Sequence, residues 1–295
     1  MKKVYAGIDL HSTNNYLVVI DEQDNRLYEK RLANDSEQIL SALQPFKSKL
    51  TGVAVESTFN WYWLVDALQD AGHKAHLVNT NAVKQYDGLK YTDDKWDSFW
   101  LAHILRLGIL PEGYIYPKEQ RAVRDLLRRR LKYVSQRTAH INSLQSALSR
   151  HLGKSMSGRD IKKLSEEEAQ ALFSSPHLSL MAVSNIKTIR FLTGIIKDIE
   201  KAVLEEAKLA PEFKILLTIP GVGKILALTI MLEVGDIGRF PKVGDYSSYC
   251  RCVNSKKTSN GKKKGENNRR NGNKYLAWAY VEAANFTNRF CPEAH

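Results

Sequence analysis

The chain has 295 residues, of which 43% are hydrophobic and 26% are charged, and this predicts a globular protein of about two domains. Its 44 lysines and arginines outnumber its 32 aspartates and glutamates, and the resulting net charge of +12 favours a polyanionic partner. No apolar run reaches the roughly 18 residues that a membrane span needs. The first residues also lack the pattern of a signal peptide, so we expect a cytoplasmic protein with no membrane partner.

Short apolar runs separated by turn residues predict an α/β domain in the first hundred residues. The expected order is three strands, helix, strand, helix, strand, helix. This is the order of the RNase H-like (RuvC-like) fold, in which the first and fourth strands are neighbours. The expected elements are strands over 4–10, 16–20 and 26–32, a helix with Ser36 as its N-cap, a strand over 52–56, a helix over 61–71, a strand over 74–78 and a helix over 94–105.

Four carboxylates fall at positions that this fold would bring together. Asp9 and Glu56 end neighbouring strands, and Asp94 and Asp97 share one face of the 94–105 helix. Converging carboxylates repel one another unless cations lie among them. Two Mg²⁺ ions about 4 Å apart would neutralise the cluster and hold both oxygens of an in-line phosphoryl displacement. The four acids therefore predict a magnesium site.

Each acid also has a purely structural interpretation. Asp9 can simply end its strand, and Glu56 can cap the helix that follows. Asp93 is an adjacent rival to Asp94 as a ligand, but its position favours the N-cap of the 94–105 helix.

The middle of the chain predicts an antiparallel helical hairpin. Its arms are a helix over 118–152 and a return helix over 184–209, joined by a loop or tip over 154–176. Between Arg121 and Arg150 there are eight basic residues and one acidic residue. A spacer or dimerisation role is favoured. The alternative is that the basic face, with Arg128, Arg129 and Arg130, lies along a phosphate backbone.

A glycine turn follows in the sequence Ile219-Pro-Gly-Val-Gly223-Lys224, which has the form of a helix-hairpin-helix turn. Gly221 and Gly223 permit a tight turn, and the free N–H groups of the helix that starts near Lys224 can bind a phosphate without reading sequence. The alternative is a plain turn between two core helices.

The most basic stretch runs from Arg251 to Lys274, with nine basic residues and one acid. It holds a serine loop that contains Ser255 and Ser259 and precedes a helix opened by Gly272 and Asn273. No nearby histidine offers to act as a base, so the residues alone favour a polyanion-binding loop. The residues expected to contact nucleic acid are Lys256, Lys257, Lys262, Lys263, Lys264, Arg269 and Arg270.

Taken together, these motifs resemble the DEDD transposases of the insertion-sequence one-ten family, which are bridge-RNA-guided serine recombinases related to Piv-type DNA invertases. The resemblance covers nearly the whole chain. It is carried by Gly7-Ile-Asp9-Leu-His11, Val55-Glu56-Ser57, Asp94-x-x-Asp97, the glycine turn, the serine loop and Gly272-Asn-x-Tyr-Leu276.

The resemblance implies a mechanism. Asp9, Glu56, Asp94 and Asp97 would hold Mg²⁺, and Ser259 would attack the scissile phosphate to form a covalent phosphoserine. The implied partners are donor and target DNA, a structured non-coding guide RNA and further copies of the chain in a homodimer or homotetramer. Different protomers would supply the two halves of one site. The implied location is the nucleoid of a bacterial or archaeal cell.

The resemblance also implies a domain organisation. Residues 1–115 would form the RuvC-like catalytic domain, 116–209 a coiled-coil dimerisation region, and 210–295 a mostly α C-terminal transposase domain that carries the serine loop.

The sequence leaves three alternatives open, one for the nucleophile and two for the function. Cys252-Val-Asn-Ser255 stands where the family often has Gly-Leu-x-Pro, which leaves Ser255 as a second candidate nucleophile. A RuvC-like nuclease that uses metal-activated water would need neither serine. A non-catalytic RNA- and DNA-binding derivative of a transposase is the third possibility, because the sequence ends soon after the Ala283-Ala284 helix.

Overall fold

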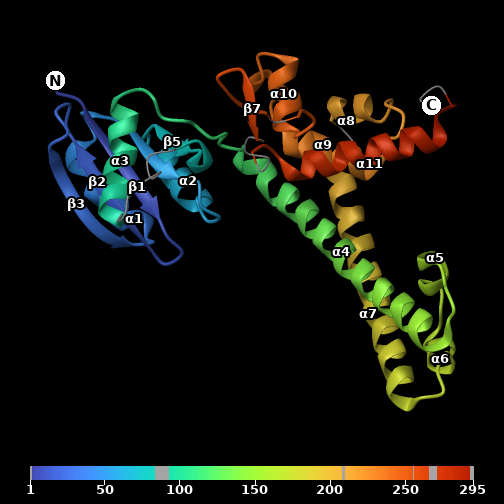
Figure 1. Ribbon diagram of the computed structural model, residues 1–295. Coiled ribbons are helices and arrows are strands. Elements are labelled where there is room, and N and C mark those ends of the chain that lie inside the picture. Colours follow the sequence, from blue (N-terminus) through green and yellow to red (C-terminus); the bar gives the residue numbers. More distant parts are fainter. Residues whose placement is uncertain (1, 84–92, 208–209, 255, 266–270, 293–295) are drawn as a thin grey trace. The chain divides into compact units, whose positions relative to one another are not determined.

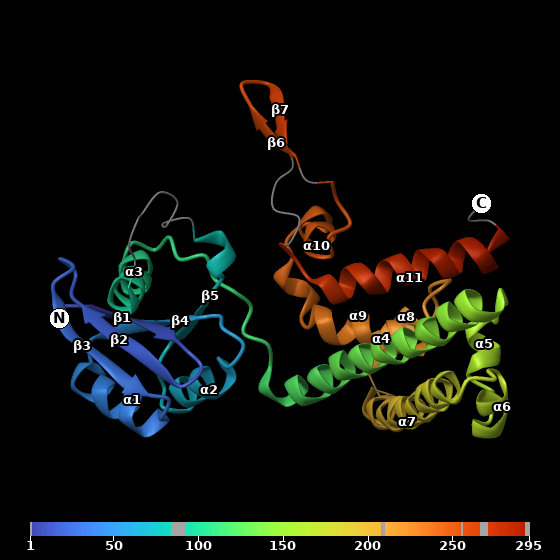
Figure 2. The same cartoon turned by 60° about the horizontal axis from the view of Figure 1, so that its bottom comes forward.

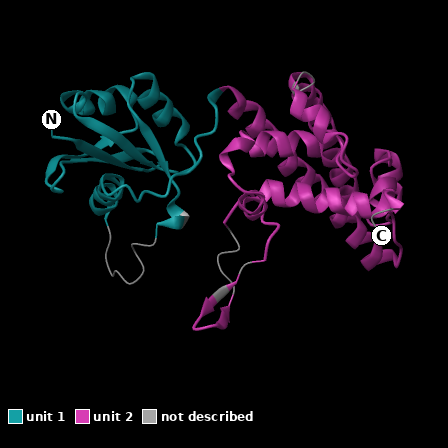
Figure 3. Cartoon of the chain, turned by 90° about the horizontal axis from the view of Figure 1, so that it is seen from above, with its two compact units in different colours: residues 1–118 teal, residues 119–295 magenta. Residues whose placement is uncertain are grey.

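A computed structural model describes residues 2–83, 93–207, 210–254, 256–265 and 271–292. The chain divides into two compact units, residues 1–118 and residues 119–295 (Figure 3). Each unit has a hydrophobic core of its own. The further division of the second unit near residue 209 stays a prediction.

Unit 1 is a mixed α/β domain whose elements follow the predicted order (Figure 1). The described elements are β1 (Val4–Leu10), β2 (Asn14–Ile20), β3 (Arg26–Ala33), α1 (Ser36–Leu43), the 3₁₀ turn η1 (Gln44–Phe46), β4 (Leu50–Glu56), α2 (Tyr62–Asp70), β5 (Ala75–Val78), the 3₁₀ turn η2 (Thr80–Ala82) and α3 (Asp94–Arg106).

The five strands form one sheet in the order β3-β2-β1-β4-β5. β1 pairs antiparallel with β2 and parallel with β4, and β5 pairs parallel with β4. The expectation that the first and fourth strands are neighbours is therefore confirmed. This architecture is consistent with the RNase H-like fold.

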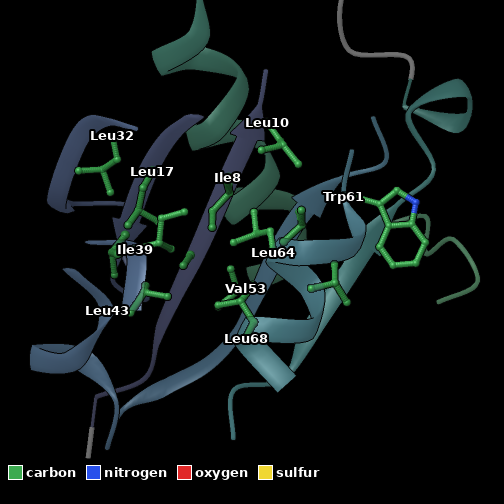
Figure 4. Close-up of a cluster of buried hydrophobic side chains, with 14 of the residues drawn as sticks. Ile8, Leu10, Leu17, Leu32, Ile39, Leu43, Val53, Trp61, Leu64 and Leu68 are labelled. Carbon is green, nitrogen blue, oxygen red and sulfur yellow. The ribbon is translucent and has the colours of Figure 1, made fainter. Parts of the chain in front are cut away.

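Side-chain alternation along the strands divides the domain into two layers. Even-numbered residues of β1, such as Ile8, face α1 and α2 and form the main core with Leu64 and Leu68, as Figure 4 shows. Tyr5, an odd-numbered residue of β1, points to the opposite face of the sheet and packs with Ala102 of α3. Helices α1 and α2 thus cover one face of the sheet and α3 covers the other (Figure 2).

The contact between β1 and α3 depends on Gly7. A Cβ atom at this position would overlap the Ser98 carbonyl oxygen and lie 2.6 Å from the Ala102 backbone nitrogen, closer than packed atoms can approach. Only glycine therefore lets the α3 backbone rest directly on β1.

Unit 2 is mostly helical. Its described elements are α4 (Lys118–Leu152, which begins on the last residue of unit 1), α5 (Gly158–Ile161), α6 (Glu166–Ala171), α7 (Pro176–Ala207), α8 (Pro211–Leu216), α9 (Lys224–Val234), the 3₁₀ turn η3 (Ile237–Arg239), α10 (Val243–Tyr249), β6 (Lys257–Ser259), β7 (Lys262–Gly265) and α11 (Lys274–Phe290).

Helices α4 and α7 form the predicted antiparallel hairpin (Figure 1). Leu144 of α4 packs near Ile186 of α7, whereas Leu127, at the other end of α4, packs near Val203. The pairing of early with late residues gives the antiparallel direction.

The connection between these helices differs from the prediction. The segment expected to be a loop over 154–176 contains α5 and α6, and the return helix begins at Pro176 rather than at residue 184. Side-chain caps nucleate the short helices: Ser165 and Glu168 form a capping box at the start of α6. Ile161 and Phe173 are buried against the hairpin, which gives these turns a packing partner.

The start of α1 also differs by one residue. Asp35, not Ser36, is the N-cap, because its carboxylate accepts hydrogen bonds from the Glu37 and Gln38 backbone N–H groups.

We predict that Gly7→Ala lowers the free energy of unfolding of the intact chain by roughly 2–4 kcal/mol, because the new methyl group must push α3 off β1. Thermal unfolding followed by tryptophan fluorescence measures this, since four of the five tryptophans, Trp61, Trp63, Trp96 and Trp100, lie in unit 1.

Gly194→Ala in α7 is the matched control, because a Cβ there meets nothing within 4 Å and alanine favours a helix. Equal effects of the two substitutions would contradict the packing role of Gly7.

Candidate active site

Asp9 and Glu56 lie side by side at the ends of the two central strands. β1 and β4 run parallel with Ile8 opposite Val55, so the next residue of each strand is a carboxylate. Both side chains lie on the face of the sheet that α3 covers. On β4, Ala54 packs against Leu101 of α3, and Glu56, two residues later, points to the same side. The sheet therefore directs two carboxylates toward the start of α3.

Helix α3 adds Asp94 and Asp97 in its first turn. Asp93 caps the helix by accepting a hydrogen bond of 2.8 Å from the Trp96 backbone N–H, which confirms its predicted role. The Ser98 side chain is fully buried, and its hydroxyl oxygen lies 2.9 Å from the Tyr16 carbonyl oxygen on β2. Because Tyr16 pairs with Asp9, Ser98 fixes α3 beside that carboxylate.

Glu56 shows the electrostatic consequence of this arrangement. Burial, a hydrogen bond shared with Asp9, and the charges of Asp9 and Asp97 raise the pKa of Glu56 to about 8. Asp9 is itself only 3% exposed. At neutral pH the metal-free cluster therefore holds a proton on Glu56 that a free carboxyl group would have released.

Asp94 has the opposite environment. Partial burial acts to raise its pKa, but a hydrogen bond from Arg31 and the nearby His11 outweigh it and hold the pKa of Asp94 below its usual value. Arg31 forms an ion pair with Asp94 Oδ2, and His11 Nε2 lies 3.3 Å from Asp94 Oδ1 and 3.2 Å from Asp9 Oδ2.

Asp9 and Asp94 thus offer donor atoms close to one another, whereas Glu56 is hydrogen-bonded to Asp9 and feels the charge of Asp97. The role of the four acids as metal ligands stays a prediction. Sequence reasoning assigned no role to His11 or Arg31. His11 follows Asp9 by two residues and was already part of the quoted motif. Arg31 lies on β3, and it pairs opposite Tyr16, so only the register of the sheet could have revealed it.

The cluster fits a divalent cation. Carboxylate oxygens are the ligands that Mg²⁺ prefers, and Asp9 Oδ2 is buried without a hydrogen bond among the described residues. Asp9, His11 and Asp94 each offer one donor atom, and these atoms lie within 4.8 Å of one another.

Two of the three α4 arginines considered for nucleic-acid contacts form ion pairs within unit 2. Arg128 donates two hydrogen bonds, of 2.6 and 2.7 Å, to Glu233 of α9, and Arg130 donates to Glu200 of α7. These two arginines hold the helices together, which leaves the exposed Arg129 as the candidate of this group for a phosphate contact.

Glu233 is the centre of a buried polar junction. It is 3% exposed and also accepts a hydrogen bond of 2.7 Å from the Asn273 side-chain nitrogen. The Asn273 side-chain oxygen caps α11 by accepting from the Tyr275 and Leu276 backbone N–H groups. The Gly272-Asn273 motif therefore joins α11 to α9, and through Arg128 to α4.

The predicted glycine turn lies between α8 and α9. Gly221 has a φ of 80°, a left-handed conformation that favours glycine, and α11 packs so closely on it that a Cβ would overlap Thr287 and the Ala283 carbonyl oxygen. Gly223 is the N-cap of α9, with no side-chain cap, and Lys224 is the first residue of the helix. Phosphate binding by Gly221, Gly223 and Lys224 stays a prediction.

The serine loop forms a two-stranded hairpin, which projects from the helices in Figure 2. Asn260 and Gly261 have φ values of 51° and 70°, as a tight hairpin turn between strands requires. Ser259 pairs with Lys262 beside this turn and is exposed.

The basic side chains of this region are only partly described. Lys256, Lys262, Lys263 and Lys264 are exposed, as a nucleic-acid-binding surface requires. The backbone of Lys257 lies in β6. Ser255, Arg269 and Arg270 lie outside the described residues.

A sheet of this strand order with a carboxylate cluster at its centre is consistent with the RNase H-like transposases. Comparison with known families supports this class. Residues 6–152 match the family model of IS110 DEDD enzymes, described as "Transposase", and residues 213–295 match the model described as "Transposase IS116/IS110/IS902 family". The chain belongs to the IS110 family of transposases, enzymes that cut and rejoin DNA.

A relative supports the same conclusion along the full length. The chain is 24% identical to "Putative transposase y4qE" of Sinorhizobium fredii over 301 residues, which cover 99% of this chain and 73% of the relative. Within the described stretches, no helix has the length and apolar character needed to cross a membrane.

The raised pKa of Glu56 predicts a pH-dependent stability. The folded protein keeps a proton between pH 4.5, the ordinary value, and about pH 8, whereas the unfolded chain releases it. The free energy of unfolding should therefore fall as pH rises through this window. After allowance for solvent screening, we expect a loss of about 1–3 kcal/mol.

Glu56→Gln should remove this contribution. Unfolding in EDTA from pH 4.5 to 9 should then show wild type losing stability relative to the variant as pH rises. Parallel stability curves for the two proteins would contradict the assigned environment of Glu56.

Substitutions of Arg128 and Arg129, which are adjacent in α4, should affect different properties of the protein. Arg128→Met should lower the free energy of unfolding by about 3–5 kcal/mol, because Glu233 would remain buried without its cation. Arg129→Ala should change it by less than about 0.5 kcal/mol and instead weaken DNA binding, with a shallower dependence on salt. Urea unfolding and fluorescence anisotropy measure the two effects, and destabilisation by Arg129→Ala would contradict this division of roles.

Proposed function

We propose that this transposase cuts and rejoins DNA with a magnesium site held by Asp9, Glu56, Asp94 and Asp97 and with Ser259 as its nucleophile. The observation that carries the proposal is the carboxylate cluster, in which burial, together with the neighbouring Asp9 and Asp97, raises the pKa of Glu56. A divalent cation is the counter-charge that would let all four acids ionise together.

The four acids have distinct environments within this proposal. Asp9 provides a buried carboxylate and Glu56 a half-buried one at the strand ends, whereas a hydrogen bond from Arg31 helps hold the pKa of Asp94 below its usual value. When bound, Mg²⁺ would neutralise these carboxylates, polarise the scissile phosphate and stabilise the leaving oxygen.

Ser259 would supply the attacking oxygen. Its Oγ forms a bond to the scissile phosphorus, the bond from phosphorus to one strand oxygen breaks, and the serine proton passes overall to that leaving oxygen. A hydroxyl end of the other DNA then attacks the phosphoserine, restoring Ser259 and joining the strands. The exposed position of Ser259 beside the turn and the neighbouring lysines of β7 support this role, because a positive hairpin attracts phosphate.

The partners follow from the family resemblance and the charge of the chain. We propose donor and target DNA as substrates, a structured non-coding RNA that selects both by base pairing, and a homodimer or homotetramer in which different protomers supply the acids and the serine. The basic residues of the hairpin and the N–H groups near Gly223 and Lys224 would contact phosphates. Strand exchange should therefore require the RNA encoded beside the gene, and equal activity without it would remove the guide from the proposal.

Ser259→Ala should abolish the covalent protein–DNA adduct and leave nucleic-acid binding intact. Denaturing gels with labelled DNA and Mg²⁺ would detect the adduct, and mass spectrometry of the digested adduct would identify the modified residue. Thr258→Ala, a hydroxyl removed from the preceding exposed position, is the matched control and should keep the adduct.

The other outcomes separate the alternatives. An adduct that persists in Ser259→Ala but disappears in Ser255→Ala would make Ser255 the nucleophile. Cleavage by the wild type without any adduct would indicate a nuclease that uses water. Binding of RNA and DNA without cleavage at any Mg²⁺ concentration would indicate a non-catalytic derivative.

A further inference from the structure

His11 lies between two of the proposed metal ligands. Its Nε2 atom is 3.2 Å from Asp9 Oδ2 and 3.3 Å from Asp94 Oδ1. Metal bonds of about 2.1 Å place neighbouring ligand atoms about 3 Å apart around one ion. The two distances from His11 Nε2 are therefore close to those expected of atoms that share a cation.

The atoms involved are buried without hydrogen bonds. The His11 side chain is 40% exposed as a whole, but Nε2 itself is buried, and neither it nor Asp9 Oδ2 makes a hydrogen bond of good geometry among the described residues. Buried polar atoms usually have a partner, and these two atoms lie 3.2 Å from each other.

The backbone holds His11 in this position. Its carbonyl oxygen accepts hydrogen bonds of 3.0 Å from the side chains of both Asn34 and Asn60, and its N–H donates to the Asn14 carbonyl oxygen. Asn34 is itself bonded to the buried Asn15. Loops that follow β3 and β4 thus fix the backbone of His11 beside the two aspartates.

We propose that His11 Nε2 is a metal ligand that completes a one-histidine, two-carboxylate set with Asp9 and Asp94. An imidazole nitrogen adds little affinity for Mg²⁺ but favours transition-metal ions. The site would therefore bind Mn²⁺ more tightly than Mg²⁺, and His11 would be the origin of the preference. This inference rests on the proposed function, because Asp9 and Asp94 are its metal ligands.

Pulsed electron paramagnetic resonance of Mn²⁺ bound to the full chain tests the proposal directly. Wild type should show the modulation of a coordinated ¹⁴N nucleus, which His11→Gln should lose while still binding Mn²⁺. His103→Gln, another histidine of unit 1, is the matched control and should keep the signal. Asp9→Asn should weaken Mn²⁺ binding itself.

Calorimetric titration provides a second readout. His11→Gln should raise the dissociation constant for Mn²⁺ on the order of tenfold and that for Mg²⁺ by less than about threefold. Equal losses for both ions would indicate a merely structural role for His11 and would overturn the inference.

The outcomes also separate this inference from the proposed function. Bound Mn²⁺ without a nitrogen signal in wild type, or a signal that persists in His11→Gln, would overturn the role of His11 and leave the carboxylate site standing. Failure of wild type to bind either ion would overturn both proposals.

Discussion

The approach of α3 to β1 over Gly7 is the contact on which the candidate site depends. Without a side chain at this position, the helix backbone rests on the strand, and Ser98 links it to β2 next to Asp9. The first turn of α3 then brings Asp94 and Asp97 to the ends of the central strands. Packing energy from the apolar layers thus offsets the cost of gathering carboxylates, a balance common at functional sites.

The order and type of the elements in unit 1 could be predicted because period-two alternation and turn residues are local signals. The bounds of α4 follow from its uninterrupted helical pattern. The connection over 154–176 was not predicted as helical, because α5 and α6 are short and gain stability by burying Ile161 and Phe173 against the hairpin. The Ser165–Glu168 capping box was the available signal.

The carboxylate cluster could be predicted because fold order alone places strand ends and a helix start together. His11 and Arg31 could not be assigned a role. The contacts of His11 depend on the conformation of the loop between β1 and β2, and those of Arg31 depend on the register of β3. In α4, charge suggested nucleic-acid contacts for Arg128 and Arg130, yet each has a carboxylate partner contributed from far along the chain. A basic run in sequence does not reveal which of its members face inward.

The proposed function depends on a divalent cation that binds among Asp9, Glu56, Asp94 and Asp97. Iron-directed cleavage measures this most directly: Fe²⁺ replaces Mg²⁺, and ascorbate with peroxide generates radicals that cut the backbone near the ion. If the ion binds there, cuts should fall at the end of β1, the end of β4 and the first turn of α3. Excess Mg²⁺ should suppress these cuts, and Asp9→Asn should lose them. Cuts confined to other segments, or unchanged in that variant, would contradict the proposed site.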